Sequence, residues 1–309
     1  MRRLIIDTDT GSDDAWAIVE ALRARDIIKI EAIMAVCGNL PLDLCLKNAM
    51  LAEDAAGRDL PPVYRGSEAS LAGKNDFYAP EVHGSDGLGE MNLPAPERAS
   101  GEQGAVKALI ERVMAAPGEI EIAAIGPLTN IARAIIKEPL FPANVKHLWV
   151  LGGGGHGMGN MTAWAEYNVY CDPEAADIVL KSGVSSTWVT WDALGEEGQI
   201  TWKEMDELSA SESSAARFCG RCARTLKDYN YNMNGKERFA VIDTALMTAV
   251  LYPEVMMEVF EAFCSVTLEK GEKRGFFGVD RENRNPNARV CTLLDSALYK
   301  EKLFKLLGK

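Results

Sequence analysis

The chain has 309 residues, of which 47% are hydrophobic and 25% are charged, and its net charge is −12. This composition is typical of a globular protein with a substantial core, so disorder is not expected. The negative charge, with no clustered Lys and Arg, argues against nucleic acid as a partner. No apolar run reaches the ~20 residues that cross a bilayer, so a membrane partner is not expected.

The N-terminal segment and the cysteines both predict a cytoplasmic location. The N-terminal MRRLIIDTD reaches charged residues by position 7, which leaves no room for the apolar region of a signal peptide. Seven cysteines, without a disulfide framework, indicate reduced thiols. Cys219 and Cys222 form a C-x-x-C that is either half of a zinc or redox site or a pair of helical residues. Because no second pair completes a tetrahedral site, the helical interpretation is favoured.

Short β-branched runs alternate with segments of helical periodicity along the first two thirds of the chain. The predicted strands are Leu4–Ile6, Ile28–Val36, Ile120–Ile125, Leu148–Leu151 and Ser186–Thr190. One helix is predicted around Ala15–Leu22, and the others are Leu42–Ala56, Gln103–Ala115, Thr129–Lys137, Pro173–Lys181 and Thr244–Leu251. This alternation predicts an α/β fold with an open, mainly parallel, Rossmann-like sheet and helices on both faces.

Two stretches break this rhythm, at residues 66–101 and 227–238. Long irregular segments in a compact domain are usually functional lids or disordered, so both are predicted to be mobile loops. They contain aromatic side chains suited to stacking on a planar ligand, namely Phe77, Tyr78, Tyr229 and Tyr231. No composition shift marks a boundary, and residues 1–309 are predicted to form a single domain.

The most informative segment is IIDTDTGSDDAWAI, in which a buried strand runs into Asp7, Asp9, Asp13 and Asp14. Ligands of open parallel sheets gather at the carboxyl ends of the strands, where these acids lie. Four neighbouring carboxylates repel one another unless a cation sits among them, and Ca²⁺ or Mg²⁺ prefers such oxygen ligands. Capping of the following helix explains Asp13 and Asp14 but leaves Asp7 and Asp9 unexplained.

Two enzyme families place D-x-D after a first strand. The haloacid-dehalogenase-type phosphatases use D-x-D-x-[TV], with the first aspartate (here Asp7) as nucleophile and Mg²⁺ as cofactor, but Gly11 departs from that pattern. The run D-T-D-T-G-S-D-D more closely resembles the inosine–uridine-preferring nucleoside hydrolases. Further similar segments follow in order between about residues 4 and 295, namely AVCGNL, IGPLTNIA, VLGGGGHGMGN, AEYNVYCDPEAA and AVIDTALMTAV.

The resemblance implies a nucleoside hydrolase fold and calcium-dependent hydrolysis of the N-glycosidic bond of a small ribonucleoside, giving free base and ribose. It makes Asp9 both the general base that activates water and a calcium ligand. The remaining implied ligands are Asp14, Asp243 and the carbonyl of Ile125, with Asp7 supporting them from behind. The implied ribose-binding residues are Asp13, Asn39, Asn160, Glu166 and Asn168. The family is commonly a homodimer or homotetramer.

This sequence departs from the family at the residue that assists the leaving base. The inosine–uridine branch has a histidine directly before its last aspartate, and this chain has Ile242 there. His83, in EVHGSDGLG, matches a histidine of the family's first mobile loop and is the candidate catalytic group at this end. A solvated loop residue is the alternative interpretation of His83. Base specificity is therefore left open.

Several motifs also have ordinary structural interpretations. Asn39 fits a turn, the glycines at 152–155 fit a phosphate cradle or a close backbone approach, and Asp243 fits a helix N-cap. Glu166 and Asn168 fit alternation along a strand edge. A nucleoside- or ribose-binding homologue with weak catalysis is the remaining alternative function.

Overall fold

The computed structural model describes residues 1–57, 60–73 and 77–308. The strands are β1 (Arg2–Thr8), β2 (Ile28–Ala35), β3 (Val63–Arg65), β4 (Ile120–Ala124), β5 (His147–Leu151), β6 (Ser186–Val189), β7 (Ile200–Thr201), β8 (Arg238–Phe239), β9 (Met256–Val266), β10 (Phe277–Asp280) and β11 (Ala288–Leu294). The helices of the first half are α1 (Ser12–Arg23), α2 (Leu42–Ala56), α3 (Pro80–His83), α4 (Ala105–Ala115), α5 (Thr129–Lys137) and α6 (Phe141–Asn144). Those of the second half are α7 (Tyr167–Cys171), α8 (Pro173–Lys181), α9 (Trp202–Ala210), α10 (Ser214–Cys222), α11 (Arg224–Asn234), α12 (Ile242–Leu251) and α13 (Ser296–Leu307), with 3-10 turns η1 (Glu196–Gly198) and η2 (Pro253–Val255).

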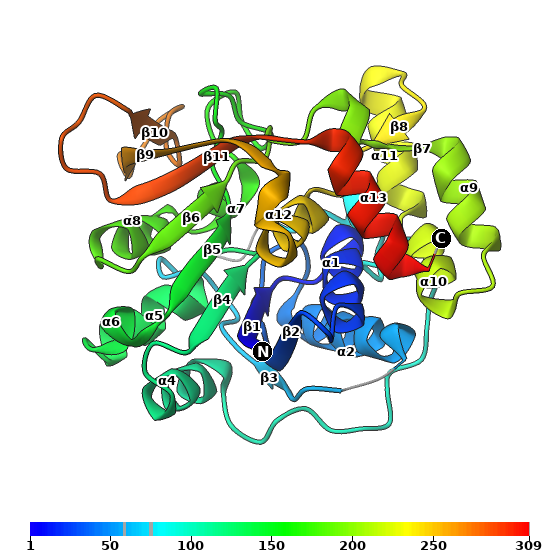
Figure 1. Ribbon diagram of the computed structural model, residues 1–309, viewed down its shortest axis with the longest axis horizontal. Coiled ribbons are helices and arrows are strands. Elements are labelled where there is room, and N and C mark those ends of the chain that lie inside the picture. Colours follow the sequence, from blue (N-terminus) through cyan, green and yellow to red (C-terminus); the bar gives the residue numbers. More distant parts are fainter. Residues whose placement is uncertain (58–59, 74–76, 309) are drawn as a thin grey trace.

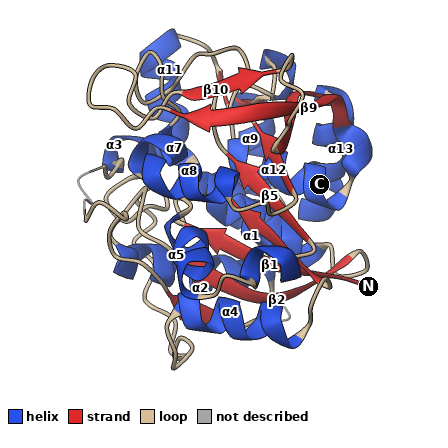
Figure 2. Ribbon diagram, turned by 90° about the vertical axis from the view of Figure 1, so that its left-hand side faces the viewer, coloured by secondary structure: helices blue, strands red, loops and turns tan. Residues whose placement is uncertain are grey.

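Nine strands form one sheet in the order β10-β9-β11-β6-β5-β4-β1-β2-β3. The seven neighbouring strands β11, β6, β5, β4, β1, β2 and β3 pair in parallel. Strand β9 pairs antiparallel with both β11 and β10. Helices lie on both faces of this sheet (Figures 1 and 2). The predicted α/β class and mainly parallel sheet are therefore confirmed.

The order of the strands reverses at β1. From β1 the chain moves outward through β2 and β3 on one side, and through β4, β5 and β6 on the other. The carboxyl ends of β1 and β4 therefore border the crevice at which such folds bind ligands. β1 is an interior strand, with β2 and β3 on one side and six strands on the other, and the polar residues that follow it are buried.

Alternation along the central strand divides the core into two layers. Leu4 and Ile6 face the layer that contains α1, α2, α12 and α13, while Ile5 faces the layer of α4, α5 and α8. Side chains of a strand point alternately to the two faces, so a strand covered on both sides must be apolar throughout. The continuous apolar run of β1 is explained in this way.

The predicted helices at 42–56, 129–137 and 173–181 have the observed bounds of α2, α5 and α8. Asp172 is the N-cap of α8, because its carboxylate accepts from the Ala175 amide 3.1 Å away and Pro173 opens the helix. Helix α2 ends at Gly57, which has a φ of 83°, the left-handed conformation that is common where helices end.

Two structural predictions are wrong. Most of the stretch 227–238, predicted to be irregular, belongs to helix α11. Asp243 is not an N-cap, because α12 begins at Ile242 and Asp243 lies in its first turn. The segment 66–101 contains the short helix α3 and is otherwise irregular in its described part, while residues 74–76 lie outside the described residues. Its mobility stays a prediction.

We retain the prediction that residues 1–309 form one domain. It is supported by a single sheet that contains strands from both ends of the chain, since β11 pairs with β6 in the same sheet that holds β1. In the described part of the chain, no helix is long and apolar enough to span a membrane.

An ion-paired carboxylate fastens the amino-terminal edge of the sheet. Glu121 of β4 accepts from Arg2 through both oxygens, at 3.0 and 2.5 Å, and also from Lys146 and the Trp149 indole at 3.0 Å. Burial alone would raise the pKa of Glu121, but these hydrogen bonds outweigh it and lower the pKa to about 2. The charged carboxylate therefore links β1, β4 and β5.

The substitution Glu121→Gln is expected to lower the free energy of unfolding by about 2 kcal/mol at pH 7. Because the folded-state pKa is depressed, this contribution is complete above pH 4.5 and is lost as the pH falls towards 2. Urea unfolding at pH 7 and pH 4 measures the difference. Glu119→Gln, which removes an exposed partner of Arg3 at the same edge, should change stability by less than about 1 kcal/mol at either pH.

Candidate active site

Acidic side chains gather where the carboxyl ends of β1, β2 and β4 meet the start of α12. In the described part of the chain, Asp13, Asp14 and Asp243 offer carboxylate oxygens that all lie within 4.8 Å of one another. We call these three residues the acidic cluster. Asp13 and Asp14 lie in the first turn of α1, where the helix dipole favours negative charge, and Asp243 lies in the first turn of α12.

Asn39 connects Asp9 to this cluster. Its backbone amide donates to Oδ2 of Asp9 at 2.7 Å, and its side-chain amide donates to Oδ2 of Asp14 at 3.0 Å. The Thr8 hydroxyl and the Gly11 amide also donate to Asp14, at 2.7 and 2.9 Å. Asn39 is therefore more than a turn residue, because it fixes the position of one carboxylate relative to another.

Two backbone segments approach the Asp9 carboxylate closely. A Cβ added to Gly38, after β2, would lie 2.1 Å from Oδ2 of Asp9, and a Cβ added to Gly126, after β4, would lie 2.5 Å from its Oδ1. Both distances are below any real contact, so only glycine fits at these two positions. The neighbouring strands thus hold the Asp9 carboxylate from both sides.

The site is short of positive charge. The Oδ1 atoms of Asp7, Asp9 and Asp13 are buried and have no hydrogen-bond partner within the described part of the chain. Burial raises the pKa of Asp9 well above its ordinary value, and the charge of Asp14 raises it further. Burial also raises the pKa of Asp243 strongly, with Asp13 contributing next. Unpartnered carboxylate oxygens that oppose one another's ionisation suit a hard cation, so this group can hold a metal ion.

The carbonyl of Ile125 and the side chains of Glu166 and Asn168 lie beside the acids. Asn168 donates through Nδ2 to the carbonyls of Ile125 and Leu151, at 3.0 and 3.2 Å. Glu166 caps helix α7 by accepting from the amides of Asn168 and Val169, and it also accepts from the Gly153 amide. The strand-edge interpretation of Glu166 and Asn168 is therefore wrong, since one is a helix cap and the other is helical.

His83 is buried, so its interpretation as a solvated loop residue is wrong. The Ser12 amide donates to Nδ1 of His83 at 3.2 Å, and the Ser12 hydroxyl lies 2.9 Å from the same atom. An Nδ1 that accepts places the ring proton on Nε2. Burial lowers the pKa of His83 to about 4, which keeps the ring neutral at pH 7.

Three further residues that the sequence singled out have different surroundings. Asn160 is exposed, and its Oδ1 accepts from the Tyr167 amide at 2.8 Å. Asp7 lies inside β1 and is fully buried, with Oδ2 accepting from Asn130 at 2.9 Å. Ile242 is half-buried, and its backbone amide hydrogen-bonds to Asp13.

Two further motifs have structural roles only. The amides of Gly153 and Gly155 already donate to the carboxylates of Glu166 and Asp192, which leaves them unsuited to cradle a phosphate. Cys219 and Cys222 are buried in α10, where Sγ of Cys222 donates to the carbonyl of Cys219. The helical interpretation of the C-x-x-C is thus the better one.

The segment before α3 closes over the site. A cavity of ≈ 10 Å³ remains beside Gly38, bounded by Phe77, Tyr78 and Cys171 among others. This is about the space of one water molecule. The Tyr167 hydroxyl donates to the Phe77 carbonyl at 2.6 Å, and the Phe77 ring packs edge-on against Tyr170 at 5.6 Å. Tyr231 packs instead against Trp202 on the neighbouring helix.

Sequence patterns missed three residues that shape the site. Ser12 holds His83, Asn130 holds Asp7, and Thr8 holds Asp14. Asn130 stands in the G-P-L-T-N segment, so that motif carried a usable signal. Nothing in the sequence indicates that Ser12 contacts a histidine 71 positions away.

Residues 4–301 match the family model described as inosine-uridine preferring nucleoside hydrolase. A crevice of acids at the switch point of a mainly parallel α/β sheet, together with this match over nearly the whole chain, places the protein in that family. It is a hydrolase that acts on N-glycosyl compounds.

Similar proteins agree with this placement. "Probable uridine nucleosidase 2" of Oryza sativa subsp. japonica is 38% identical over 82% of this chain and 74% of its own length. "Pyrimidine-specific ribonucleoside hydrolase RihA" of Shewanella woodyi is 31% identical over 95% of this chain and 93% of its own. The solved structure "Plant nucleoside hydrolase - PpNRh1 enzyme" superimposes with a TM-score of 0.93, at 30% identity, and covers 99% of this chain and 98% of that chain.

The fit of Gly38 around Asp9 gives a test of this geometry. Gly38→Ala should displace the Asp9 carboxylate and reduce kcat about 100-fold on a nucleoside substrate, while the circular dichroism spectrum stays that of the wild type. Gly104→Ala is the matched control, because a Cβ there would lie no closer than 3.8 Å to another atom. Equal activities of the two variants would contradict the geometry.

Proposed function

We propose that this chain hydrolyses ribonucleosides in a calcium-dependent reaction, with Asp9 as the general base. The observation that carries the proposal is the group of buried carboxylates with unpartnered oxygens at the switch point of the sheet. Asp9, Asp14, Asp243 and the carbonyl of Ile125 are the proposed ligands. When bound, Ca²⁺ lowers the pKa of water and orients the ribose.

The proposed roles follow from which atoms are free. Oδ2 of Asp9 is bonded to Asn39, whereas Oδ1 has no partner and can accept the proton of the attacking water. The surrounding carboxylates stabilise the positive charge that develops on the ribose in an oxocarbenium-like transition state. Asp7, held by Asn130, supports this group from inside β1.

Five side chains are proposed to bind the ribose hydroxyls, namely Asp13, Asn39, Asn160, Glu166 and Asn168. The backbone and carbonyl contacts of Asn39, Glu166 and Asn168 hold them before substrate arrives. Asp13 also belongs to the acidic cluster, so it can serve both the cation and the sugar. Prior positioning of this kind reduces the entropy lost in reaching the transition state.

We propose a pyrimidine nucleoside, uridine first, as the preferred substrate. Support comes from the relatives, whose names specify uridine or pyrimidine nucleosides. With Ile242 in place of a histidine, His83 is proposed as the catalytic group at the base. Its neutral ring can donate a hydrogen bond from Nε2 without carrying a charge.

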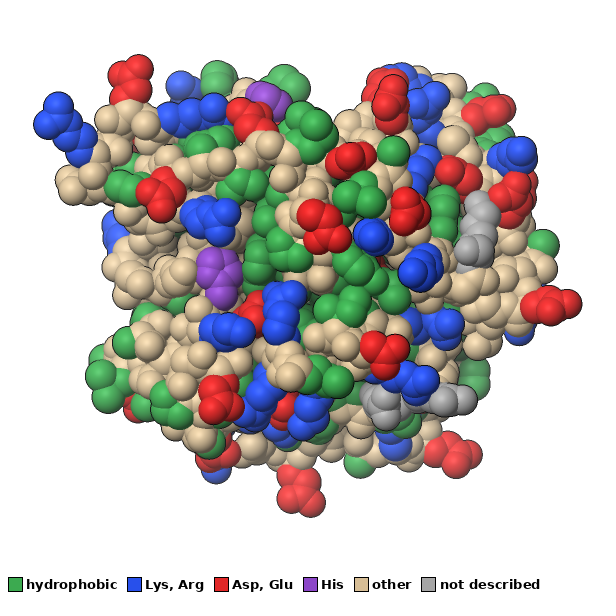
Figure 3. Space-filling model, in the orientation of Figure 1, with side chains coloured by type: hydrophobic (Ala, Val, Ile, Leu, Met, Phe, Trp, Pro, Cys, Tyr) green, Lys and Arg blue, Asp and Glu red, His purple; other side chains and the backbone are tan. Residues whose placement is uncertain are grey.

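A nucleoside is larger than the residual cavity of ≈ 10 Å³, so the segment around Phe77 must shift to admit it. This need supports the predicted mobility of the 66–101 loop. Acidic and basic side chains are interspersed on the face in Figure 3, which agrees with a small-molecule partner rather than a nucleic acid. A cytoplasmic homodimer or homotetramer stays part of the proposal.

Two alternative functions, a phosphatase and a binding protein without catalysis, agree less well with the structure and the relatives. A phosphatase would need Asp7 as its nucleophile, but Asp7 is fully buried inside β1 and accepts a hydrogen bond from Asn130 of α5. A binding protein without catalysis does not fit the family match and the hydrolase relatives.

Uridine hydrolysis, followed as released reducing sugar, should require calcium and Asp9. Chelator should abolish turnover and added Ca²⁺ should restore it, whereas Asp9→Asn should reduce kcat at least 1,000-fold with an unchanged fold. The same assay with inosine ranks the nucleosides, and release of phosphate from phenyl phosphate measures phosphatase activity. Full turnover in chelator, or phosphate release without sugar release, would overturn the proposal.

The assignment of His83 is tested by His83→Phe. Loss of the Nε2 donor should lower kcat/KM about 100-fold. Since the wild-type ring is already neutral above pH 5, the shape of the pH–rate profile between pH 5.5 and 8 should stay the same. His147→Gln, at the opposite edge of the sheet, serves as the control. A His83 variant as active as that control would remove His83 from the mechanism.

A further inference from the structure

A second cavity, of ≈ 420 Å³, lies outside the site described above. It is formed by the segment after α3 together with α9, α10 and α11, which Figure 1 shows grouped at the side of the molecule away from β10. We call it the α9–α11 pocket and define it by Met91, Met205, Arg221, Arg224 and Lys227. Its volume falls within the range of about 300–1,000 Å³ typical of small-molecule sites.

The charge of this pocket is opposite to that of the chain. Three cationic side chains, Arg221, Arg224 and Lys227, line it in a protein of net charge −12. No ion pair within 4.0 Å joins any of the three to an acid of the described residues. Arginines without ion-pair partners in a concave site favour an anionic ligand.

The two acids of the pocket do not cancel this charge. The carboxylate of Glu90 is occupied within its own segment, because it accepts from the amide and the hydroxyl of Ser85 at 2.6 and 3.0 Å. Asp228 lies on α11 one position after Lys227 and is exposed. With three cations against two acids, the lining is positive overall.

The remaining lining consists of two methionines, two glycines and Ser209. Met91 and Met205 contribute flexible apolar surface, and the Lys227 ammonium lies 4.4 Å from the centre of the Trp202 ring. A Cβ added to Gly89 would lie 2.5 Å from the carbonyl oxygen of Cys222, so this segment lies directly against α10. The backbone of this wall is therefore in place before a ligand arrives, while Arg221 and Arg224 are exposed at the pocket.

We propose that the α9–α11 pocket is a binding site for a small phosphate monoester that carries a ring. The arginines bind the phosphate, and the methionines contact the ring. This inference does not depend on the proposed nucleoside hydrolysis.

The pocket is connected to the candidate active site through its own wall. The Gly89 amide donates to the His83 carbonyl at 2.9 Å, and the Cys222 thiol lies 3.6 Å from the Ser12 carbonyl. His83 and Ser12 are themselves joined at the candidate active site. A ligand in the pocket thus contacts the segment that positions His83, which makes the site suited to regulation.

Calorimetric titration of the full-length chain with phenyl phosphate tests the proposal. This probe has the anionic group and the ring but no ribose, so it does not mimic a nucleoside in the acidic site. We expect one saturable site, no binding of the neutral analogue benzyl alcohol, and a Kd about tenfold weaker in Arg224→Gln. Arg221→Gln should act in the same direction.

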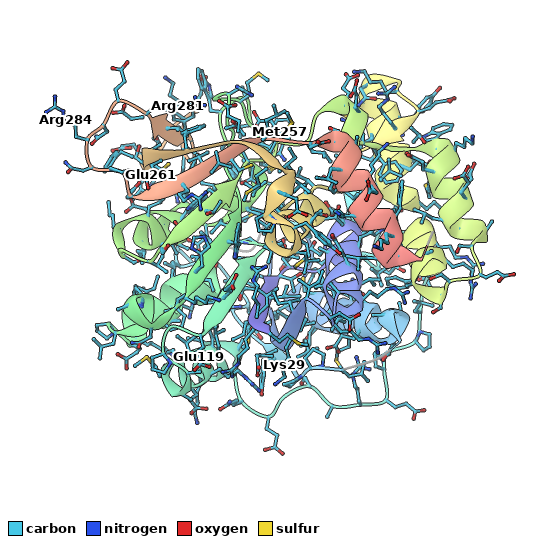
Figure 4. The ribbon with its side chains drawn as sticks, viewed as in Figure 1. Lys29, Glu119, Met257, Glu261, Arg281 and Arg284 are labelled. Carbon is cyan, nitrogen blue, oxygen red and sulfur yellow. The ribbon has the colours of Figure 1, made fainter. Side chains whose placement is uncertain are left out.

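Arg284→Gln is the matched control, since Arg284 is an exposed arginine between β10 and β11 and projects from the far end of the molecule (Figure 4). It removes the same charge and should leave Kd unchanged. Absence of saturable binding at millimolar phenyl phosphate would overturn the proposal. So would equal weakening by Arg224→Gln and Arg284→Gln, or no weakening by either. Urea unfolding of each variant excludes misfolding as the cause of a weaker Kd.

Discussion

Repulsion among buried carboxylates is the constraint around which this molecule is arranged. Asp9, Asp13, Asp14 and Asp243 lie in the interior at the end of the central strand, where burial disfavours their ionisation and each charge disfavours the next. Asn39 and Thr8 supply hydrogen bonds, and the helix dipole of α1 supplies partial positive charge. These contacts leave some oxygens unpartnered, so a bound cation would stabilise the fold as well as serve the chemistry.

The sequence predicted correctly those helices that have one apolar face and clear end signals. Helices α2, α5 and α8 have one apolar face and clear ends, and their bounds match the periodicity of the sequence. The strand β9 was missed because it is half-exposed along its first half and buried at alternate positions only later. Helix α11 was misread because it is rich in Asn and Tyr and buries Leu226 alone of its described residues. Asn has a low helix propensity, and this polar composition favours a loop interpretation.

The candidate site was predictable as a set of residues rather than as an arrangement. The spacing of the aspartates pointed to a cation and to the end of β1, and the acids do lie there together. The sequence did not indicate that Asp13 lies within 4.8 Å of Asp14 and Asp243, or that Asn39 joins Asp9 to Asp14. Such contacts depend on how α1 and α12 approach each other, which is set by packing over long sequence separations.

The tight fit of Gly38 and Gly126 against Asp9 has a consequence for how such a protein can diversify. Even one additional methyl group at either position would disturb the carboxylate, so the floor of the site is closed to change. The walls are different, since Phe77 and Tyr78 lie on a connecting segment and Ile242 lies at the start of a helix. New preferences for the departing ring can therefore accumulate by exchange of wall residues, while the bond-breaking apparatus is inherited intact.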